Sequence, residues 1–459
     1  MWESPVGFAD TLALYHEEGD YILHNYGLNS WIVVSREDYN QIVAPLRRER
    51  LTPARVAAAY GERMGLPAAA ARQKVGSLLL LLFANRIALP PHQPAPVAPG
   101  GIQGRQVPKI IYFVTTYRCN LSCQYCYADS SPEVETRGDL STAEAMALID
   151  QVAELGVSYM AFTGGEALLR KDCIDLIAHA RSRGLKPFLI TNGSPVTPEK
   201  VKRLAPLLSG VTVSMDSPAA EQGHDAVRGR GSWEAARRAI ALFQEAGVPV
   251  AVNTTVTARS VESMPEMVSW ALDRSIQTHR IGAVSDLGRG GLNPLAAGPL
   301  ERLRAERGAH RILVERLDEV DLDGIKLFNT PLSPFQLKRH CGVGVEEISV
   351  DSLGDVYPCK LLHLPHLKAG NIRERSLREI WEGSEIFEAM LGVNPDNLPD
   401  CRPCTFRYIC GGGCRAHQMS MTGDLYGTFN QDCPSLRRSL RRHMWLHWQK
   451  RTAGQAGRR

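Results

Sequence analysis

Six short apolar runs alternate with helical stretches between residues 109 and 284, and this alternation limits the folds that the chain can adopt. The runs are KIIYFVTT, YMAFTGG, KPFLITNG, GVTVSMDS, VPVAVNTTVT and THRIGAV. Strands that alternate with helices form βαβ units and pair in parallel within one sheet. Six units predict an α/β fold, a partial (β/α)6 TIM-like barrel that is open on one side. In such a barrel, functional groups gather at the carboxyl ends of the strands.

The eleven cysteines are distributed unevenly. Cys119, Cys123 and Cys126 follow the first strand, Cys173 stands alone, and seven more lie within residues 341–433. The N-terminus lacks a basic segment followed by an apolar core, so we expect no signal peptide and a cytoplasmic protein. Clustered cysteines in a reducing compartment are more often metal ligands or catalytic groups than disulfides.

The first cysteine cluster has the spacing C-x3-C-x2-C, in CNLSCQYC. It resembles the signature of the radical S-adenosylmethionine (SAM) enzymes, and FTGGEALL resembles their glycine-rich motif after the second strand. The resemblance implies that Cys119, Cys123 and Cys126 hold a [4Fe–4S] cluster whose open iron binds SAM. Reductive cleavage of SAM would then give a 5′-deoxyadenosyl radical that abstracts hydrogen from the substrate. A zinc site would leave the glycine motif and the strand pattern unexplained.

The same resemblance implies a set of SAM contacts at the ends of the strands. The candidates are Tyr125, Gly164, Gly165, Glu166, Ser214, Asp216, Arg228 and Asn253.

The second cysteine region begins with Cys341, followed by twelve residues, Gly354, four residues and Cys359. It continues with C-x2-C-x5-C-x3-C in CRPCTFRYICGGGC and ends at Cys433. The order is similar to the seven-cysteine SPASM domain, which holds two auxiliary [4Fe–4S] clusters in peptide-modifying radical SAM enzymes. A pair of structural zinc sites is the alternative.

The SPASM resemblance also implies which cysteines share a cluster. The first auxiliary cluster would take Cys341, Cys359 and Cys414, and the second Cys401, Cys404, Cys410 and Cys433. The first would then lack one cysteine ligand, leaving that iron to a substrate thiolate, a water or a non-cysteine side chain. In the sulfatase-maturing branch an aspartate after YPC accepts a proton, but here Lys360 stands there. A cation is a poorer proton acceptor, so the catalytic residues remain unknown.

The N-terminal region reads as a separate small domain. YILHNYGLNSWIVVS predicts a β-hairpin, and Ser35 and Thr52 are predicted N-caps of the helices that follow. Strands followed by short helices fit a winged helix, and the arrangement resembles the PqqD-like domain, a recognition element for ribosomally made peptides. In that family a leader peptide adds as a strand to the sheet edge. A winged helix that only packs on the barrel is the alternative.

The predicted organisation has six parts. They are a winged-helix domain (1–89), a Pro-rich linker (90–107), the radical SAM barrel (108–300), a helical connector (301–340), the SPASM domain (341–436) and a basic tail (437–459). We expect the cysteine-rich part to lack a large apolar core and to be held together by metal. The tail carries eight Lys or Arg and no acid, which favours a solvated terminal helix that frays.

Three further features receive structural readings. Cys173 is predicted to be a buried small hydrophobe, and GRGG, residues 288–291, a plain turn. His363 and His366 are predicted to be solvated loop residues.

The predicted function is that of a peptide maturase, a radical SAM oxidoreductase that abstracts hydrogen from a ribosomally made peptide and leaves a crosslink or other oxidation. Its cofactors would be SAM and three [4Fe–4S] clusters. Its partners would be a precursor peptide with a leader and an electron donor such as flavodoxin or ferredoxin. The net charge of +4 implies no nucleic-acid partner, and no apolar run is long enough for a membrane span. The alternatives are a SPASM enzyme that modifies a small molecule, such as a tetrapyrrole side chain, and a structural metal-binding protein.

Overall fold

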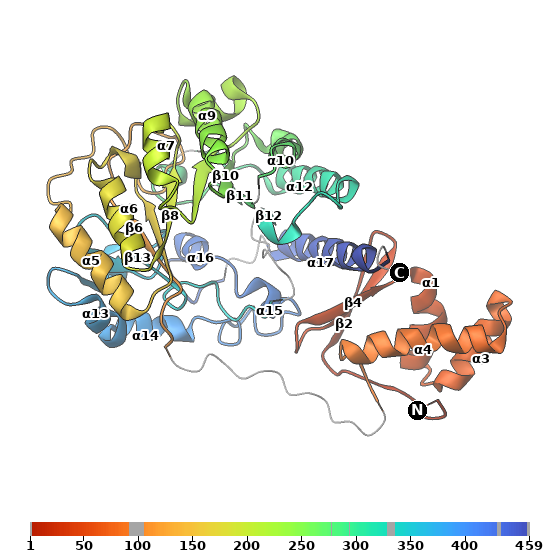
Figure 1. The fold of residues 1–459 in the computed structure, drawn as a ribbon. Coiled ribbons are helices and arrows are strands. Elements are labelled where there is room, and N and C mark those ends of the chain that lie inside the picture. Colours follow the sequence, from red (N-terminus) through yellow and green to blue (C-terminus); the bar gives the residue numbers. More distant parts are fainter. Residues whose placement is uncertain are drawn as a thin grey trace.

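The computed structural model describes residues 2–90, 105–276, 278–292, 294–327, 336–428 and 433–456. Figure 1 shows a curled sheet covered by helices, a cysteine-rich segment beside it, and a small N-terminal domain at the far side of helix α17. Residues 91–104 of the predicted linker lie outside the described residues.

All six predicted strands form, and they pair in parallel in the predicted order. They are β6 (Ile110–Val114), β7 (Tyr159–Thr163), β8 (Lys186–Thr191), β9 (Gly210–Ser214), β10 (Val250–Val256) and β11 (Thr278–Ala283). Side chains alternate between the two faces of each strand. On β6, Ile111 and Phe113 are buried in the core under the helices, whereas Tyr112 lines a cavity inside the curled sheet.

Helices follow the barrel strands and cover the outer face of the sheet (Figure 1). They are α5 (Thr142–Leu155), α6 (Cys173–Ser182), α7 (Pro198–Leu204), α9 (Ser232–Glu245), α10 (Met264–Asp273) and α12 (Pro299–Glu315). Two shorter helices, α8 (Ala226–Arg228) and α11 (Arg289–Leu292), lie in connections that follow β9 and β11. Short turns of helix lie at Ala167–Leu169 (η2), Ala220–Asp225 (η3) and Val261–Ser263 (η4). Cys173 is 1% exposed and belongs to this core, as predicted.

The sheet continues past both ends of the predicted barrel. The added strands are β12 (Ile325–Leu327), β13 (Glu347–Val350), β14 (Asp355–Tyr357) and β15 (Gly370–Asn371). β12 pairs in parallel with β11, so residues 301–340 are more than a helical connector. β13 pairs in parallel with β6, and β14 and β15 extend that edge antiparallel. The cysteine-rich region is therefore built onto the barrel sheet.

The expectation that residues 341–436 lack a large apolar core is wrong for their first part. Ile348, Val350, Val356 and Phe387 are buried in the same cluster as the barrel core. The remaining elements of the region are η6 (Pro365–Leu367), α13 (Leu377–Gly383), α14 (Glu385–Gly392), α15 (Arg407–Cys410) and α16 (Arg415–Thr422). Apolar burial thus supports the segment on which the cysteines lie.

The N-terminal domain contains the predicted hairpin within a three-stranded antiparallel sheet of order β2-β3-β4. Its elements are β1 (Gly7–Phe8), β2 (Leu12–Glu17), β3 (Asp20–Asn25), β4 (Ser30–Val34), α1 (Arg36–Asp38), η1 (Tyr39–Val43), α2 (Ala44–Arg48), α3 (Pro53–Met64), α4 (Ala68–Ala84) and β5 (Ala88–Leu89). Both predicted caps form, since the Ser35 and Thr52 hydroxyls accept hydrogen bonds from backbone amides three residues later. The winged-helix assignment stays a prediction.

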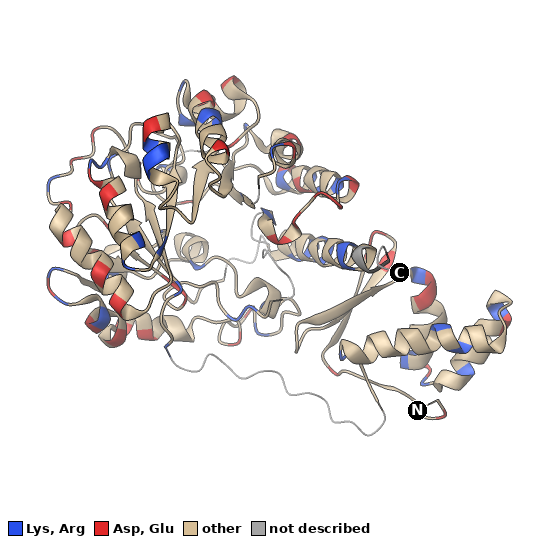
Figure 2. Cartoon of the chain, viewed as in Figure 1, with Lys and Arg blue, Asp and Glu red and all other residues tan. Residues whose placement is uncertain are grey.

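The expectation of a frayed, solvated tail is wrong. Helix α17 (Cys433–Ala456) lies between the barrel and the small domain, and its Lys and Arg are spread along it (Figures 1 and 2). Leu440, Met444 and Trp448 are buried in the core of the N-terminal domain, and Leu446 is buried against the barrel. The apolar residues at four-residue spacing outweigh the charges around them.

The N-terminal domain also packs on the second cysteine region. Tyr15 Oη donates to Thr405 Oγ1 at 2.6 Å and its ring stacks on Phe406 at 4.9 Å. The Arg407 guanidinium lies 5.4 Å from the centre of the Tyr26 ring. The domain is thus seated on residues 405–407 and α17. Within the described part of the chain, no helix is long and apolar enough to cross a membrane.

Candidate active site

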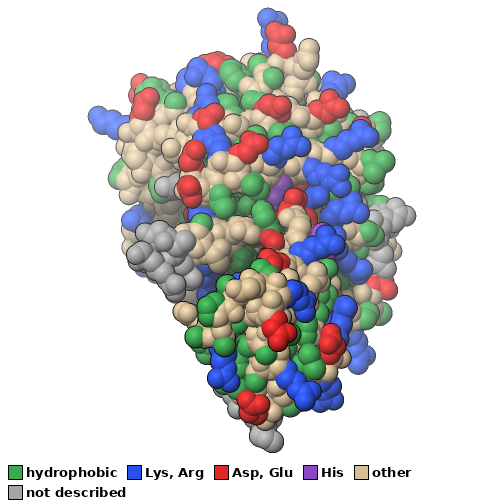
Figure 3. Space-filling model, turned by 90° about the vertical axis from the view of Figure 1, so that its right-hand side faces the viewer, with side chains coloured by type: hydrophobic (Ala, Val, Ile, Leu, Met, Phe, Trp, Pro, Cys, Tyr) green, Lys and Arg blue, Asp and Glu red, His purple; other side chains and the backbone are tan. Residues whose placement is uncertain are grey.

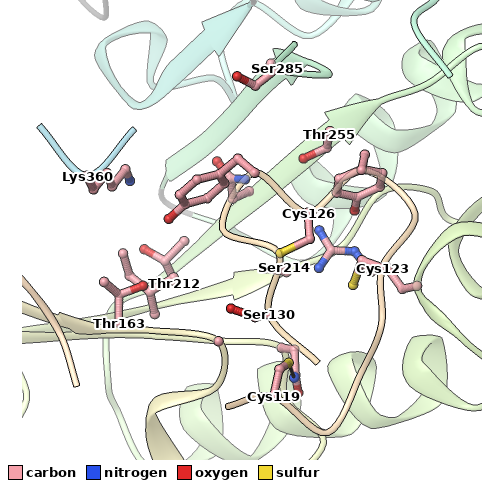
Figure 4. A pocket seen from close by; sticks show the side chains of 18 of the residues that line it. Cys119, Cys123, Cys126, Ser130, Thr163, Thr212, Ser214, Thr255, Ser285 and Lys360 are labelled. Carbon is pink, nitrogen blue, oxygen red and sulfur yellow. Dashed lines mark hydrogen bonds between the residues drawn. The ribbon is translucent and has the colours of Figure 1, made fainter. Parts of the chain in front are cut away.

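A cavity of about 460 Å³ lies inside the curled sheet, at the carboxyl ends of its strands, and is large enough for a small-molecule ligand. Nine of the predicted site residues line it: Cys119, Cys123, Tyr125, Cys126, Gly164, Gly165, Ser214, Arg228 and Asn253. Figure 4 shows the labelled cysteines on the loop after β6, with Lys360 entering from a separate segment across the pocket. Thr191, Asn192, Thr255, Arg280 and Ser285 also line the cavity, and sequence analysis did not single them out.

The two glycines after β7 hold the cysteine loop by close backbone contact. Gly165 N donates to Thr116 O at 2.8 Å, and Glu166 N donates to Arg118 O at 3.0 Å. A Cβ atom on Gly165 would lie 2.5 Å from Arg118 O. These positions therefore need glycine so that the strand end and the loop can approach each other.

Glu166 does not line the cavity and instead ties two strand ends together. Its carboxylate accepts hydrogen bonds from Leu168 N at 3.1 Å, Thr191 Oγ1 at 2.9 Å and Asn192 N at 2.7 Å. Burial raises the pKa of Glu166, although these hydrogen bonds oppose the shift. The Asn192 amide in turn lies 3.7 Å from Cys119 Sγ. Glu166 thus supports the cavity wall from behind.

Asp216 also lies behind the wall, where it orients Arg228. Arg228 donates from Nε to one carboxylate oxygen at 2.7 Å and from Nη2 to the other at 3.0 Å. Tyr125 Oη donates to the same carboxylate, and Thr255 N donates to it at 2.9 Å. Burial alone would raise the pKa of Asp216, but the charge of Arg228 lowers it below its ordinary value. The Asp216 carboxylate thus fixes Arg228 by an ion pair and Tyr125 by a hydrogen bond, and both of these side chains line the cavity.

The GRGG segment does more than turn the chain, so its interpretation as a plain turn was wrong. Arg289 donates from its backbone N to Cys126 O at 2.9 Å, from Nε to Cys123 O at 2.9 Å and from Nη2 to Ser130 O at 2.7 Å. A Cβ on Gly288 would lie 2.6 Å from Cys126 O. The segment therefore clamps the part of the cysteine loop from Cys123 to Ser130, whereas Gly165 contacts the part before Cys119. Its position in the connection after barrel strand β11 was the signal available in the sequence.

A second cavity of about 520 Å³ adjoins the first and shares Tyr127, Gly164, Lys360 and Leu361 with it. His363 lines this cavity, which corrects its prediction as a solvated residue, whereas His366 is exposed.

Both ring nitrogens of His363 have hydrogen-bond partners. Nδ1 lies 2.5 Å from Tyr117 Oη, and Nε2 lies 2.9 Å from Ser349 Oγ. Burial lowers the pKa of His363 to about 4, so its imidazole is neutral at pH 7. Lys360 stands between the two cavities, with Nζ 4.5 Å from the centre of the Tyr112 ring.

The remaining clustered cysteines gather in two neighbouring places. Cys401, Cys404, Cys410, Cys414 and Cys433 line a small cavity of about 60 Å³. Burial raises the pKa of the Cys359 thiol, and the negative charges of nearby Glu347, Cys414 and Cys341 raise it further. Buried thiols with raised pKa values become good ligands only when a cation offsets the thiolate charge.

The described residues contain no group of three or more His, Cys, Asp or Glu side chains that converges on a single metal ion. A four-iron cube needs its ligands farther apart than one ion does, and none of the eleven cysteines forms a disulfide. The thiol-only donor sets fit iron–sulfur clusters. The protein has a parallel sheet with three thiols after the first barrel strand, a ligand-sized cavity that these thiols line, and further thiols nearby. These features define an iron–sulfur protein of the partial-barrel class.

Comparison with known proteins agrees with this class. The model of the radical SAM superfamily matches residues 113–271, and that of the iron-sulfur cluster-binding domain SPASM matches residues 341–405. The chain belongs to the radical SAM superfamily and carries a SPASM domain; it binds SAM and iron–sulfur clusters.

Two kinds of curated relative are similar to the chain. An AdoMet-dependent heme synthase of Nitratidesulfovibrio vulgaris is 31% identical over 69% of this chain and 89% of the relative. A PqqA peptide cyclase of Methylocella silvestris is 31% identical over 67% of this chain and 83% of the relative.

Two solved structures share the fold. Native anSMEcpe with bound AdoMet matches with a TM-score of 0.61 and 19% identity, over 75% of this chain and 99% of that one. Streptococcus suis SuiB bound to S-adenosylmethionine matches with a TM-score of 0.56 and 16% identity, over 93% of this chain and 99% of that one. The part left out of the SuiB match is shorter than the N-terminal domain, so the similarity in fold extends into that domain.

Proposed function

We propose that the chain is a peptide maturase, which uses SAM to abstract hydrogen from a ribosomally made peptide and leaves a crosslink or another oxidation. The observation that carries the proposal is the fold shared with SuiB across 93% of the chain, because SuiB has been solved bound to its precursor peptide SuiA. The PqqA peptide cyclase relatives support a peptide substrate independently.

The proposed metal ligands form three sets, which together would hold three [4Fe–4S] clusters. The SAM cluster takes Cys119, Cys123 and Cys126, the first auxiliary cluster Cys341, Cys359 and Cys414, and the second Cys401, Cys404, Cys410 and Cys433. A reduced cluster bound by Cys119, Cys123 and Cys126 would supply the one electron that cleaves SAM into methionine and the 5′-deoxyadenosyl radical, which abstracts hydrogen.

The chain's own residues position SAM. We assign contacts to Tyr125, Ser214, Arg228 and Asn253, which line the cavity, and to backbone carbonyl groups of Gly164 and Gly165. Glu166 and Asp216 act on SAM indirectly, since their carboxylates are occupied by hydrogen bonds within the wall. The substrate would enter through the adjoining cavity of about 520 Å³, beside Lys360 and His363.

The N-terminal domain would recruit the leader of the precursor. Within the described residues, β2 and β4 are the edge strands of its sheet, and an extended peptide adds to such an edge through main-chain hydrogen bonds. Figure 3 shows that acidic, basic and hydrophobic side chains are interspersed on this end of the molecule. A leader that binds through main-chain hydrogen bonds does not require a uniformly positive or uniformly negative surface at this end of the molecule.

Small-molecule modification is the second candidate, and the heme synthase relatives favour it. A tetrapyrrole has no leader, so this alternative gives the N-terminal domain no part in substrate binding.

The test compares the two substrates on the reconstituted full-length enzyme, with SAM and a reduced flavodoxin or ferredoxin. A precursor peptide encoded beside the gene should lose hydrogen, as detected by mass spectrometry. Hydrogen exchange at the amides of β2 or β4 should slow when the leader binds, while central strand β3 serves as the unchanged control. Turnover of an iron tetrapyrrole, with no modification of the peptide and no protection of either edge, would overturn the proposal.

A further inference from the structure

The cysteine set of the first auxiliary cluster is one protein ligand short, and a half-buried carboxylate, that of Glu347, lies beside it. Glu347, the first residue of β13, is an electrostatic neighbour of both Cys341 and Cys359. Those two thiols and Cys414 are neighbours of one another. The inference drawn here rests on the proposed function, in that these three cysteines are assigned to one cluster.

The backbone after Cys341 turns back sharply and brings Glu347 to the cysteines. Glu347 N donates to Gly342 O at 3.0 Å, and Gly344 N lies 3.0 Å from Glu347 O and 2.9 Å from Pro358 O. One hydrogen-bonded turn therefore joins the residue after Cys341, the glutamate and the residue before Cys359. Glu347 is held at this place by main-chain geometry, before its side chain makes any contact.

The side chain of Glu347 points toward the cysteine set. Its Cγ and Cδ lie 3.8 and 4.0 Å from the position that a Cβ on Gly342 would take. The carboxylate also has a hydrogen bond with Cys359. The described residues that line the two active-site cavities include Lys360 but not Glu347. The carboxylate thus faces the thiols and lies apart from the substrate space.

A carboxylate packed among thiols needs a cation to offset the negative charges. Thiolates and a carboxylate repel one another strongly where water is excluded. Lys326, Lys338 and Lys360 surround Glu347 and reduce this cost, and they would equally balance the negative charge of a cluster with four anionic ligands. Iron accepts carboxylate oxygen as well as thiolate sulfur.

We propose that the Glu347 carboxylate is the fourth protein ligand of the first auxiliary cluster. The cluster then has no iron open to a substrate thiolate or to water. Its part in turnover is limited to accepting or passing an electron.

The test uses full-length protein that lacks the SAM-cluster cysteines, so that only the auxiliary clusters contribute to the spectra. Glu347→Ala and Glu347→Cys are reconstituted with iron-57 and examined by Mössbauer and EPR spectroscopy, with and without added mercaptoethanol. Glu346→Gln is the matched control, because the neighbouring Glu346 pairs with Lys109 at 2.6 Å and its side chain is 44% exposed.

The protein that keeps Glu347 and the Glu346→Gln control should give spectra that do not respond to mercaptoethanol. Glu347→Ala should respond to the thiol and should lose about one iron per chain on mild oxidation, as a cube with an open iron does. Glu347→Cys should keep that iron and show a signal that differs from that of the glutamate. If Glu347→Ala fails to assemble, the cysteine variant decides, because an assembled and thiol-insensitive Glu347→Cys supports the ligand role.

Two results would overturn the proposal: a response to mercaptoethanol with Glu347 in place, or a Glu347→Cys cluster that behaves as an open one. Neither depends on a substrate, so failure here is distinguishable from failure of the peptide proposal. The underlying cysteine assignment has its own readout. Replacing Cys341, Cys359 and Cys414 with alanine should remove about four irons.

Discussion

The loop that carries Cys119, Cys123 and Cys126 and the segment that carries the second auxiliary cysteines are held in place by different parts of the molecule. The loop is fixed by hydrogen bonds from the barrel itself, at Gly165 and Arg289. The auxiliary segment is buried by parts of the chain outside the barrel: its Phe406 and Ile409 lie in one hydrophobic cluster with the N-terminal domain and helix α17. One site is preformed by its own domain, and the other is completed by segments distant in the sequence.

This difference teaches that the small domain is more than a tethered module. Its core is shared with α17 and with residues next to Cys404 and Cys410. Deleting the domain would expose Phe406, Leu440 and Met444, so a deletion cannot separate leader binding from support of the second auxiliary cluster. Single substitutions in each region compare the two sites more cleanly.

The largest effect is expected from removing the thiols of the barrel loop. Replacing Cys119, Cys123 and Cys126 with alanine should abolish formation of 5′-deoxyadenosine, because no iron is left to bind SAM. Iron content should fall from about twelve to about eight per chain, since the auxiliary clusters have their own ligands. Undiminished SAM cleavage in the triple variant would refute the assignment, and iron saturating near four in the wild type would sink the three-cluster count.

The next effect sharpens the comparison from the auxiliary side. Leu440→Ala removes a fully buried side chain from the shared core and should cost about 2–5 kcal/mol of unfolding free energy. Iron should be lost from the second auxiliary cluster first, while substrate-free SAM cleavage persists. Leu300→Ala is the control, because Leu300 is 69% exposed. If Leu440→Ala lost SAM cleavage to the same extent as auxiliary-cluster iron, the two sites would not be independently supported.

A smaller effect is expected at the clamp on the barrel loop. Arg289→Ala removes the side-chain donor to the buried Ser130 carbonyl group, which costs about 1–3 kcal/mol. The Cys123 carbonyl group loses one of its two donors and keeps Cys126 N at 3.2 Å. The variant should lose iron from the SAM cluster and lose SAM cleavage in proportion. The spectroscopic signals of the auxiliary clusters should stay unchanged. Arg237→Ala is the control, since Arg237 is exposed and contacts Glu234 and Trp233 of its own helix. An Arg289→Ala variant with wild-type iron and SAM affinity would refute the clamp.

The same comparison explains what the sequence predicts well. The six strands follow from periodicity. The resemblance to the radical SAM family supplied Tyr125, Gly164, Gly165 and Arg228 as candidate site residues, and all four line the cavity. In the sequence alone, Glu166 and Asp216 cannot be told apart from residues that line the cavity. Hydrogen bonds within the folded wall decide that they support it from behind.

Long-range packing accounts for the features that were missed. The pairing of β13 with β6 joins segments far apart in the chain, and no local pattern specifies such a partner. The apolar stripe of Leu440, Met444 and Trp448 in α17 is visible in the sequence. The eight basic residues of the tail, 437–459, nevertheless favoured the interpretation as a solvated helix. Whether a charged helix packs depends on a partner surface, here the N-terminal domain.

The smallest effects concern the titration of buried groups where α12 meets α17. Burial lowers the pKa of His310 to about 3 and that of His447 to about 4. Below pH 6.5 the unfolded chain protonates these histidines and the folded chain does not. Each one therefore reduces stability by about 1.4 kcal/mol per pH unit as the pH falls toward its folded pKa.

Glu306, on the same helix as His310, should act in the opposite direction. Burial raises its pKa to about 7, so between pH 7 and 4.5 the folded chain holds a proton that the unfolded chain has released, and stability rises as the pH falls. One carboxyl group thus offsets about one histidine in that range. We expect His310→Gln to flatten the fall of unfolding free energy between pH 6.5 and 4.5, and Glu306→Gln to steepen it, each by about 1.4 kcal/mol per pH unit. Urea unfolding of full-length protein at a series of pH values measures both slopes, with exposed His366→Gln as the control. Parallel slopes in all four proteins would mean that these groups titrate alike in the folded and unfolded chains, and that the α12–α17 contact is open to water.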